Sequence, residues 1–387
     1  MKRMLTLVLL VVFLILLSVA PAGTASAKEY QFELDAKSAV LMDATTGAIL
    51  FEQNADAALP PASVTKIMTL LLVMEALDSG RISLSDPVSV SEAAASMGGS
   101  QVFLEPGETM SVEDMIKCVV IASANDAAYA LAEHVAGSEQ AFVERMNARA
   151  AELGMKNTHF ENTNGLDDTV TNHLTSARDI AIMSRELLSH PKILSYTTIW
   201  QDSIRDGSFT LTNTNRLVRF YPGATGLKTG STAKALFCIS ATAERDGTHL
   251  IAVIMGAPTR DIRNAEAKKL LDYGFAGYTL YKAEEQELPR IPVAGGRSGD
   301  VGIRLVPFSA LLAKGEEKRV EVKVVLPRSV AAPIEEGDII GYAEYTVDGR
   351  VIGRADALAT DSVERISYFD LLYRLLSEMV GAFSENR

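Results

Sequence analysis

The stretch Pro61-Ala62-Ser63-Val64-Thr65-Lys66 decides how the fold and chemistry of this chain are interpreted. It follows Pro60 and precedes an apolar run over residues 67–74, so the chain arrives extended and then turns into a helix. Residues three apart share one helical face, which brings the Ser63 hydroxyl close to the Lys66 amine. The free N–H groups and the positive dipole end of the helix lie there too. The stretch therefore predicts an activated serine nucleophile.

The segments around this helix predict an α+β domain. The helix itself, over residues 63–78, is apolar on nearly every side and should be buried. Hairpins are expected from residues 38–43 with 48–51, and from residues 235–243 with 249–255. Further helices are expected after Ser111 and Ser176, and over residues 127–135, 139–153 and 264–273. Strands at both ends with helices between them indicate one sheet assembled from distant segments.

The last hundred residues have a different pattern. Val320-Glu321-Val322-Lys323-Val324 alternates strictly, and residues 346–351 carry a hairpin signal. We therefore expect a small all-β domain over residues 285–358, after a first domain over residues 28–284. The tail, residues 359–387, has apolar residues at helical spacing. It predicts an amphipathic helix from Ser362 to Phe383 that lies on a membrane surface. The alternative is a helix packed on its own domain.

The N-terminus is typical of a secretory signal. Lys2 and Arg3 precede an apolar run over residues 5–19, and Ala25-Ser26-Ala27 offers a cleavage site, so residues 1–27 should be removed. The alternative is a retained membrane anchor. Cleavage removes two of the 37 basic residues and none of the 49 acidic ones, and the net charge goes from −12 to 35 − 49 = −14. An exported protein this acidic is a poor nucleic-acid binder.

Cysteine and histidine usage points away from a metal or cofactor. Cys118 and Cys238 lie in apolar segments and are expected to be buried free thiols rather than part of a disulfide framework. The five histidines are scattered, and no Cys/His cluster has zinc spacing. We expect His159 and His173 to lie in loops or behind the site rather than to catalyse.

Two further motifs make the pairing of Ser63 with Lys66 specific to one class of protein. Ser-x-x-Lys alone is weak, because it also occurs at Ser189 and Ser231. Ser123-Ala124-Asn125 follows an apolar segment between two expected helices, and Lys228-Thr229-Gly230 precedes the second hairpin. In this order and context, the three motifs are the signature of serine penicillin-binding proteins and β-lactamases.

The chain resembles the exported D-alanyl-D-alanine carboxypeptidases of the low-molecular-mass penicillin-binding class over nearly its whole mature length. The similar stretches are residues 61–69, 123–128, 157–160, 164–166 and 223–230, and residues 96–101 are similar to spore-associated members. The resemblance implies a β-lactamase/transpeptidase-like domain with an antiparallel sheet flanked by helices, then an all-β domain and the tail helix. It also implies removal of D-alanine from peptidoglycan stem peptides ending in D-Ala-D-Ala, inhibition by β-lactams, and no cofactor.

Roles follow from that resemblance together with physical chemistry. Ser63 would attack the D-Ala-D-Ala carbonyl to form an acyl-enzyme, and Lys66, kept neutral by burial and by the charge of Lys228, would accept its proton. The remaining groups would surround the substrate. Ser123 would relay a proton to the departing amine, and Asn125 would hold Lys66 and the amide carbonyl of the substrate. The N–H groups of Ser63 and Ser231 would form the oxyanion hole. The carboxylate of the substrate would bind at Lys228, Thr229, Gly230 and Arg263.

Three alternatives share these motifs. A class A β-lactamase would carry a Glu-x-x-Leu-Asn loop between the second and third motifs, and residues 160–166 (Phe-Glu-Asn-Thr-Asn-Gly-Leu) do not match it. A transpeptidase would pass the same acyl group to an amine instead of water. A non-catalytic peptidoglycan-binding protein would keep only the pocket, but no motif residue is missing here.

Overall fold

The computed structural model describes residues 33–373 and residue 376, and the expected signal segment lies outside them. Its first domain is built on a five-stranded antiparallel sheet in the order β2-β1-β9-β8-β7. The strands are β1 (Ser38–Asp43), β2 (Ile49–Gln53), β7 (Ala224–Thr232), β8 (Leu236–Arg245) and β9 (Thr248–Ala257). Both expected hairpins are confirmed, and the Lys-Thr-Gly motif lies on the edge strand β7.

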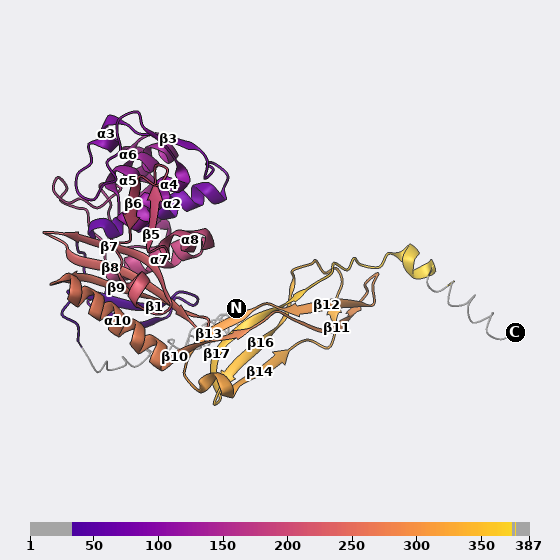
Figure 1. Cartoon of the computed structure of the whole chain (residues 1–387). Helices are drawn as coiled ribbons and strands as arrows, with labels where there is room; N and C mark the ends of the chain where they lie inside the picture. The colour runs from indigo at the N-terminus through magenta and orange to yellow at the C-terminus, as the bar shows by residue number, and fades with distance from the viewer. Residues whose placement is uncertain (1–32, 374–375, 377–387) are drawn as a thin grey trace, which may run out of the picture. The chain divides into compact units, whose positions relative to one another are not determined.

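Helices cover both faces of this sheet (Figure 1). One face carries α10 (Arg260–Gly277), whose Gly274 lies against Leu250 of β9. The other face carries α7, whose Ser184 hydroxyl lies 2.8 Å from that of Ser240 on β8, and α2 packs on α7. The long helices are α2 (Lys66–Asp78), α5 (Asn125–Ala136), α6 (Glu139–Glu152), α7 (Ala177–Leu188) and α10. The α+β class is therefore confirmed.

Shorter elements connect this framework. The turns are the 3₁₀ turns η1 (Ala62–Thr65) and η3 (Pro191–Ile193) and the π-helical turn η2 (Cys118–Ala122). The short helices are α3 (Glu92–Ala95), α4 (Val112–Lys117), α8 (Leu194–Thr197) and α9 (Leu217–Phe220). Two small antiparallel strand pairs join β3 (Pro87–Ser89) to β4 (Thr109–Ser111) and β5 (Gln201–Ile204) to β6 (Phe209–Thr212). The Ser111 and Ser176 side chains cap α4 and α7 as expected. Cys118 and Cys238 are free and buried, which confirms that prediction.

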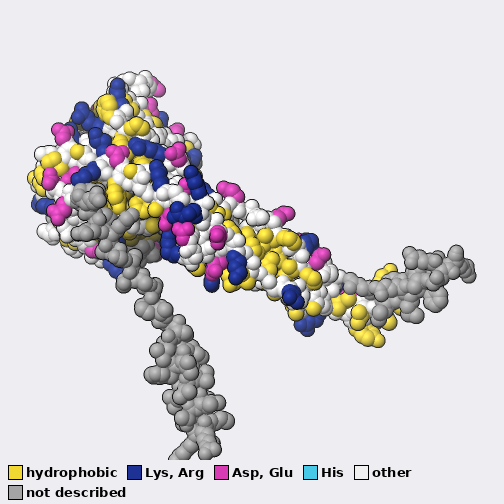
Figure 2. Space-filling view, turned by 90° about the horizontal axis from the view of Figure 1, so that it is seen from below, with side chains coloured by type: hydrophobic (Ala, Val, Ile, Leu, Met, Phe, Trp, Pro, Cys, Tyr) yellow, Lys and Arg dark blue, Asp and Glu magenta, His cyan; other side chains and the backbone are white. Residues whose placement is uncertain are grey.

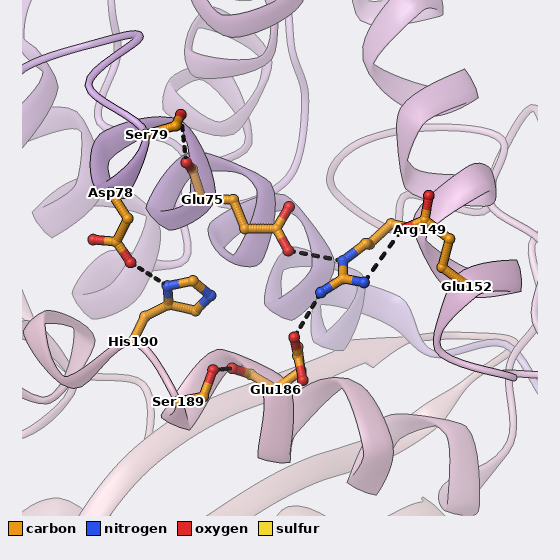
Figure 3. Close-up of polar contacts among 8 residues, drawn as sticks. All are labelled: Glu75, Asp78, Ser79, Arg149, Glu152, Glu186, Ser189 and His190. Atoms are coloured by element: carbon orange, nitrogen blue, oxygen red, sulfur yellow. Dashed lines mark hydrogen bonds and ion pairs between the residues drawn. The ribbon is translucent and has the colours of Figure 1, made fainter. Parts of the chain in front are cut away.

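The helix after Ser63 is buried, as its composition predicts: ten of its thirteen residues are buried. Its outer end is held by polar contacts, which Figure 3 shows. The Arg149 guanidinium of α6 donates to Glu75 of α2 at 2.7 Å and to Glu186 of α7 at 2.6 Å. His190 Nδ1 donates to Asp78, the last residue of α2, at 2.5 Å. Three helices are thereby joined at the end remote from Ser63.

The second domain is a β structure with its own core. Its main sheet has six strands in the order β14-β16-β17-β12-β11-β15, and a separate pair joins β10 to β13. The elements are β10 (Tyr278–Ala283), β11 (Gln286–Ala294), β12 (Asp300–Leu305), β13 (Phe308–Ala313), the 3₁₀ turn η4 (Glu316–Arg319), β14 (Val320–Val325), β15 (Val330–Ala331), β16 (Ile339–Val347) and β17 (Arg350–Ala359). The expected strand at 320–324 and the hairpin at 346–351 are confirmed.

The tail helix starts later than expected, at Tyr368 rather than at Ser362. Val363 and Arg365 form β-bridges with Ile334 and Gly296, so this part of the chain continues the β-domain. Ser367 then accepts a hydrogen bond from Asp370 N and begins the helix. Residues 374–375 and 377–387 lie outside the described part. Within the residues described, no helix is both long and apolar enough to cross a bilayer.

Candidate active site

The nucleophile position lies in the tight turn η1, just before α2. Ser63 follows Ala62, whose φ is +50°, and Lys66 is the first residue of α2. Lys66 Nζ lies 3.0 Å from Ser63 Oγ, 2.5 Å from Asn125 Oδ1 and 2.9 Å from the carbonyl oxygen of Asn164. A neutral amine has two N–H groups and one lone pair. The two oxygen acceptors can take both N–H groups, which leaves the lone pair for the Ser63 proton.

Electrostatics at Lys66 favour the neutral amine. The side chain is completely buried, and burial lowers its pKa well below the usual value, with the charge of Lys228 as the second cause. The carboxylate of Asp126 opposes this shift. Because desolvation penalises the ammonium form, the Lys66 amine is neutral, and available as a base, at lower pH than an exposed lysine. This is the direction expected from the sequence.

The second motif, Ser-x-Asn, lies where the turn η2 ends and α5 begins. Ser123 ends this turn with φ +63°, and its Oγ accepts a 2.7 Å hydrogen bond from Lys228 Nζ. Asn125 is the first residue of α5 rather than part of a loop between helices. Its Nδ2 donates to Gly98 O and its N–H donates to Ser100 O, both at 2.7 Å. These bonds fix the amide so that Oδ1 faces Lys66.

The third motif supplies positive charge from β7. Lys228 is buried, and burial followed by the charge of Arg263 lowers its pKa to about 7. Thr229 Oγ1 donates to Thr214 Oγ1 at 2.8 Å. Gly230 lies so close to η1 that an added Cβ would come within 2.8 Å of the Ser63 nitrogen. Strand β7 therefore packs directly against the turn that carries the nucleophile.

These elements surround a cleft of about 190 Å³. The residues lining it are Ser63, Ser100, Ser123, Thr214, Thr229, Gly230, Ser231, Arg260 and Arg263. Lys66, Asn125 and Lys228 are buried behind this lining and reach the cleft through their hydrogen bonds. Every residue singled out from the sequence thus belongs to one constellation. Ser100 and Thr214 lie in no motif, and neither they nor Arg260 are among the predicted site residues.

His173 lies behind the nucleophile and does not line the cleft. Its Nδ1 accepts from Glu161 N–H at 3.0 Å, so Nε2 carries the proton and donates to Thr65 Oγ1 at 2.7 Å. The Thr65 hydroxyl in turn donates to Ala62 O, the carbonyl just before Ser63. Burial lowers the pKa of His173 to about 4, which keeps this chain of bonds in its neutral form. His173 therefore supports the turn that presents Ser63.

Fold and site together define a serine hydrolase in which a buried lysine contacts the candidate nucleophile. Residues 23–259 match the D-alanyl-D-alanine carboxypeptidase family model of peptidase S11, and residues 278–365 match the penicillin-binding protein 5 C-terminal domain. The chain belongs to this D-alanyl-D-alanine carboxypeptidase family, and its activity is that of a serine-type D-alanyl-D-alanine carboxypeptidase acting on cell-wall peptidoglycan.

Individual relatives agree with this assignment. D-alanyl-D-alanine carboxypeptidase DacF of Bacillus subtilis is 42% identical over 389 residues, covering 98% of this chain and 99% of that protein. Penicillin-binding protein 5 of Haemophilus influenzae has a similar structure, with a TM-score of 0.77, 33% identity, and coverage of 87% of this chain and 100% of that one. Penicillin-binding protein D2 of Listeria monocytogenes, in a cefotaxime-bound form, has a TM-score of 0.59 and 33% identity over 64% of this chain and 100% of that one.

Proposed function

We propose that the carboxypeptidase reaction proceeds through an ester on Ser63. The Ser63 oxygen attacks the carbonyl of the terminal D-Ala-D-Ala bond while its proton passes to neutral Lys66. The C–N bond then breaks, and Ser123 passes a proton to the departing D-alanine amine and takes one up in turn, so the proton accepted by Lys66 leaves with D-alanine and Lys66 is neutral again. Water hydrolyses the ester and completes the cycle. The observation that carries this proposal is the arrangement of Lys66 Nζ, which has two carbonyl acceptors and leaves its lone pair facing Ser63.

The substrate groups fit the charges of the cleft. The terminal carboxylate of the substrate would lie at Thr229 and Arg263, above the buried amine of Lys228. Hydrogen bonds from positively charged donors to a carboxylate are stronger than those between neutral groups. The oxyanion would accept from the N–H groups of Ser63 and Ser231, and Asn125 would hold the substrate amide together with Lys66. β-Lactams, which one Listeria relative binds, would acylate the same serine. Removal of D-alanine limits cross-linking, and the site of action is the extracytoplasmic face of the membrane.

The test of this proposal is Ser63→Ala. We expect the variant to release no D-alanine from a muramyl-pentapeptide analogue and to form no penicillin adduct, while the parent gains one penicillin mass on Ser63. Mass spectrometry of the intact chain and of its peptides measures both. D-alanine release at the parental rate by the folded variant would refute the role of Ser63.

We also propose that the tail binds a membrane surface. Among the described residues of its helix, Tyr368, Phe369, Tyr373 and Leu376 are each more than half exposed, at 75%, 79%, 76% and 53%. Most of the surface of these side chains is left exposed, which favours the membrane over the alternative of a helix on its own domain. Flotation with phosphatidylcholine vesicles should retain the full chain and lose a version ending at Ile366, which keeps both β-bridges of the tail. Equal flotation of the two would exclude this role.

A further inference from the structure

The strand β14 forms an open edge of the β-domain sheet. It stands first in the strand order, and within the described residues its ladder partner is β16 on one side only (Figure 1). Residues 321–324 are exposed. An edge strand presents free N–H and C=O groups, and natural proteins usually protect such an edge from pairing with another chain.

The apolar side chains of β14 lie on the same face of the sheet as the buried core residues of β16, but they are themselves exposed. Val322 lies opposite Tyr345 and Val324 lies opposite Ala343. Residues directly opposite each other point to the same face, and both partners on β16 are buried. The two valines are nevertheless 48% and 41% exposed. Figure 2 shows hydrophobic side chains gathered on the surface of this domain. The edge is therefore apolar on the face where a continued sheet would bury it.

The charges on β14 are complementary to those of the same strand running in the opposite direction. Residues 320–324 are Val-Glu-Val-Lys-Val, so the apolar pattern is symmetric about Val322 and the two charges are opposite. In an antiparallel pair of two copies with the two-fold axis at Val322, valines face valines, and Glu321 faces Lys323 of the other copy twice. A shift of two residues would instead place Lys323 opposite Lys323 or Glu321 opposite Glu321. Like charges directly opposite are destabilising, so one register is selected.

We propose that two copies of this chain pair through β14 in this antiparallel register, which joins their β-domain sheets across a two-fold axis. A two-fold interface of this kind is closed, because the same strand is used on both sides. Pairing supplies main-chain partners to both edges and covers Val322 and Val324. An interface of one strand on each side is small, and the dimer is therefore weak in solution.

Charge exchange tests the register. The full chain in detergent should dimerise in analytical ultracentrifugation at about 100 µM, since small interfaces bind weakly. Glu321→Lys and Lys323→Glu should each raise the dimer dissociation constant at least about tenfold, because each places like charges opposite each other. An equimolar mixture of the two variants should regain the dimer, and so should the double exchange in one chain. Lys268→Glu, the same change at an exposed site on α10, is the matched control.

Cysteine cross-linking gives an independent readout. Val322→Cys should form a disulfide-linked dimer on mild oxidation, because the two thiols face each other at the axis. Glu321→Cys and Lys323→Cys should cross-link with each other more efficiently than either does with itself. D-alanine release should be unchanged in all these variants, so the result is independent of the catalytic proposal. A monomeric parent that gives no Val322→Cys cross-link, or single charge variants that dimerise like the parent, would overturn the proposal.

Discussion

Lys66→Arg will lose acylation by about 1,000-fold, within the range that a positioned general base contributes. A guanidinium stays protonated at any working pH, so it cannot take the proton of Ser63. The arginine side chain would also place a charged guanidinium between Asn125 Oδ1 and Asn164 O, the two oxygens to which the Lys66 amine donates. Stopped-flow or quenched measurement of penicillin acylation gives the rate. Lys268→Arg, at an exposed position on α10, is the matched control.

The pH dependence of acylation separates loss of the base from loss of structure. Burial and the charge of Lys228 lower the pKa of Lys66, so its neutral fraction grows as pH rises through that lowered value. The acylation rate of the parent should therefore rise with pH and level off well below the ordinary lysine range. The residual rate of Lys66→Arg should lack this limb. Acylation of Lys66→Arg within about tenfold of the parent would refute the neutral-lysine mechanism.

The sequence predicts those parts of the site that depend on local geometry. The Ser63–Lys66 contact follows from a three-residue spacing at a helix start, and it is present at 3.0 Å. The burial of α2 follows from its apolar composition. The ordered motifs also indicate that Ser123 and Lys228 meet, although 105 positions separate them, and their side chains are hydrogen-bonded. Here the resemblance supplied what spacing alone does not.

Other parts of the site depend on contacts that no local pattern encodes. Thr214 reaches the cleft because the loop after β6 places its hydroxyl on Thr229, and Ser100 does so because its carbonyl accepts from Asn125 N–H. Neither residue lies in a motif. The late start of the tail helix has a similar cause, since the bridge from Val363 to Ile334 overrides the helical spacing. Tertiary pairing outweighs local propensity in such cases.

Gly230→Ala is expected to slow acylation by about 100-fold, the cost associated with misplacing reacting groups by roughly 1 Å. A Cβ at this position would come within 2.8 Å of both Pro61 O and Ser63 N and within 2.9 Å of Val64 N. All three atoms are backbone, so no side chain can rotate away, and β7 must separate from η1. That movement separates Ser63 from Lys228 and Thr229, and it moves the two proposed oxyanion donors apart.

The effect of Gly230→Ala should be confined to the active site, because the contact of the added methyl group is relieved once β7 and η1 move relative to each other. Penicillin acylation and D-alanine release should both fall, while the thermal melting transition remains cooperative. Gly299→Ala is the matched control, since nothing lies within 4 Å of a Cβ built there. An unchanged acylation rate in Gly230→Ala would mean that β7 and η1 can separate without disturbing the reacting groups. The oxyanion hole would then not depend on both Ser63 and Ser231, because these two donors lie on the elements that the added methyl group forces apart.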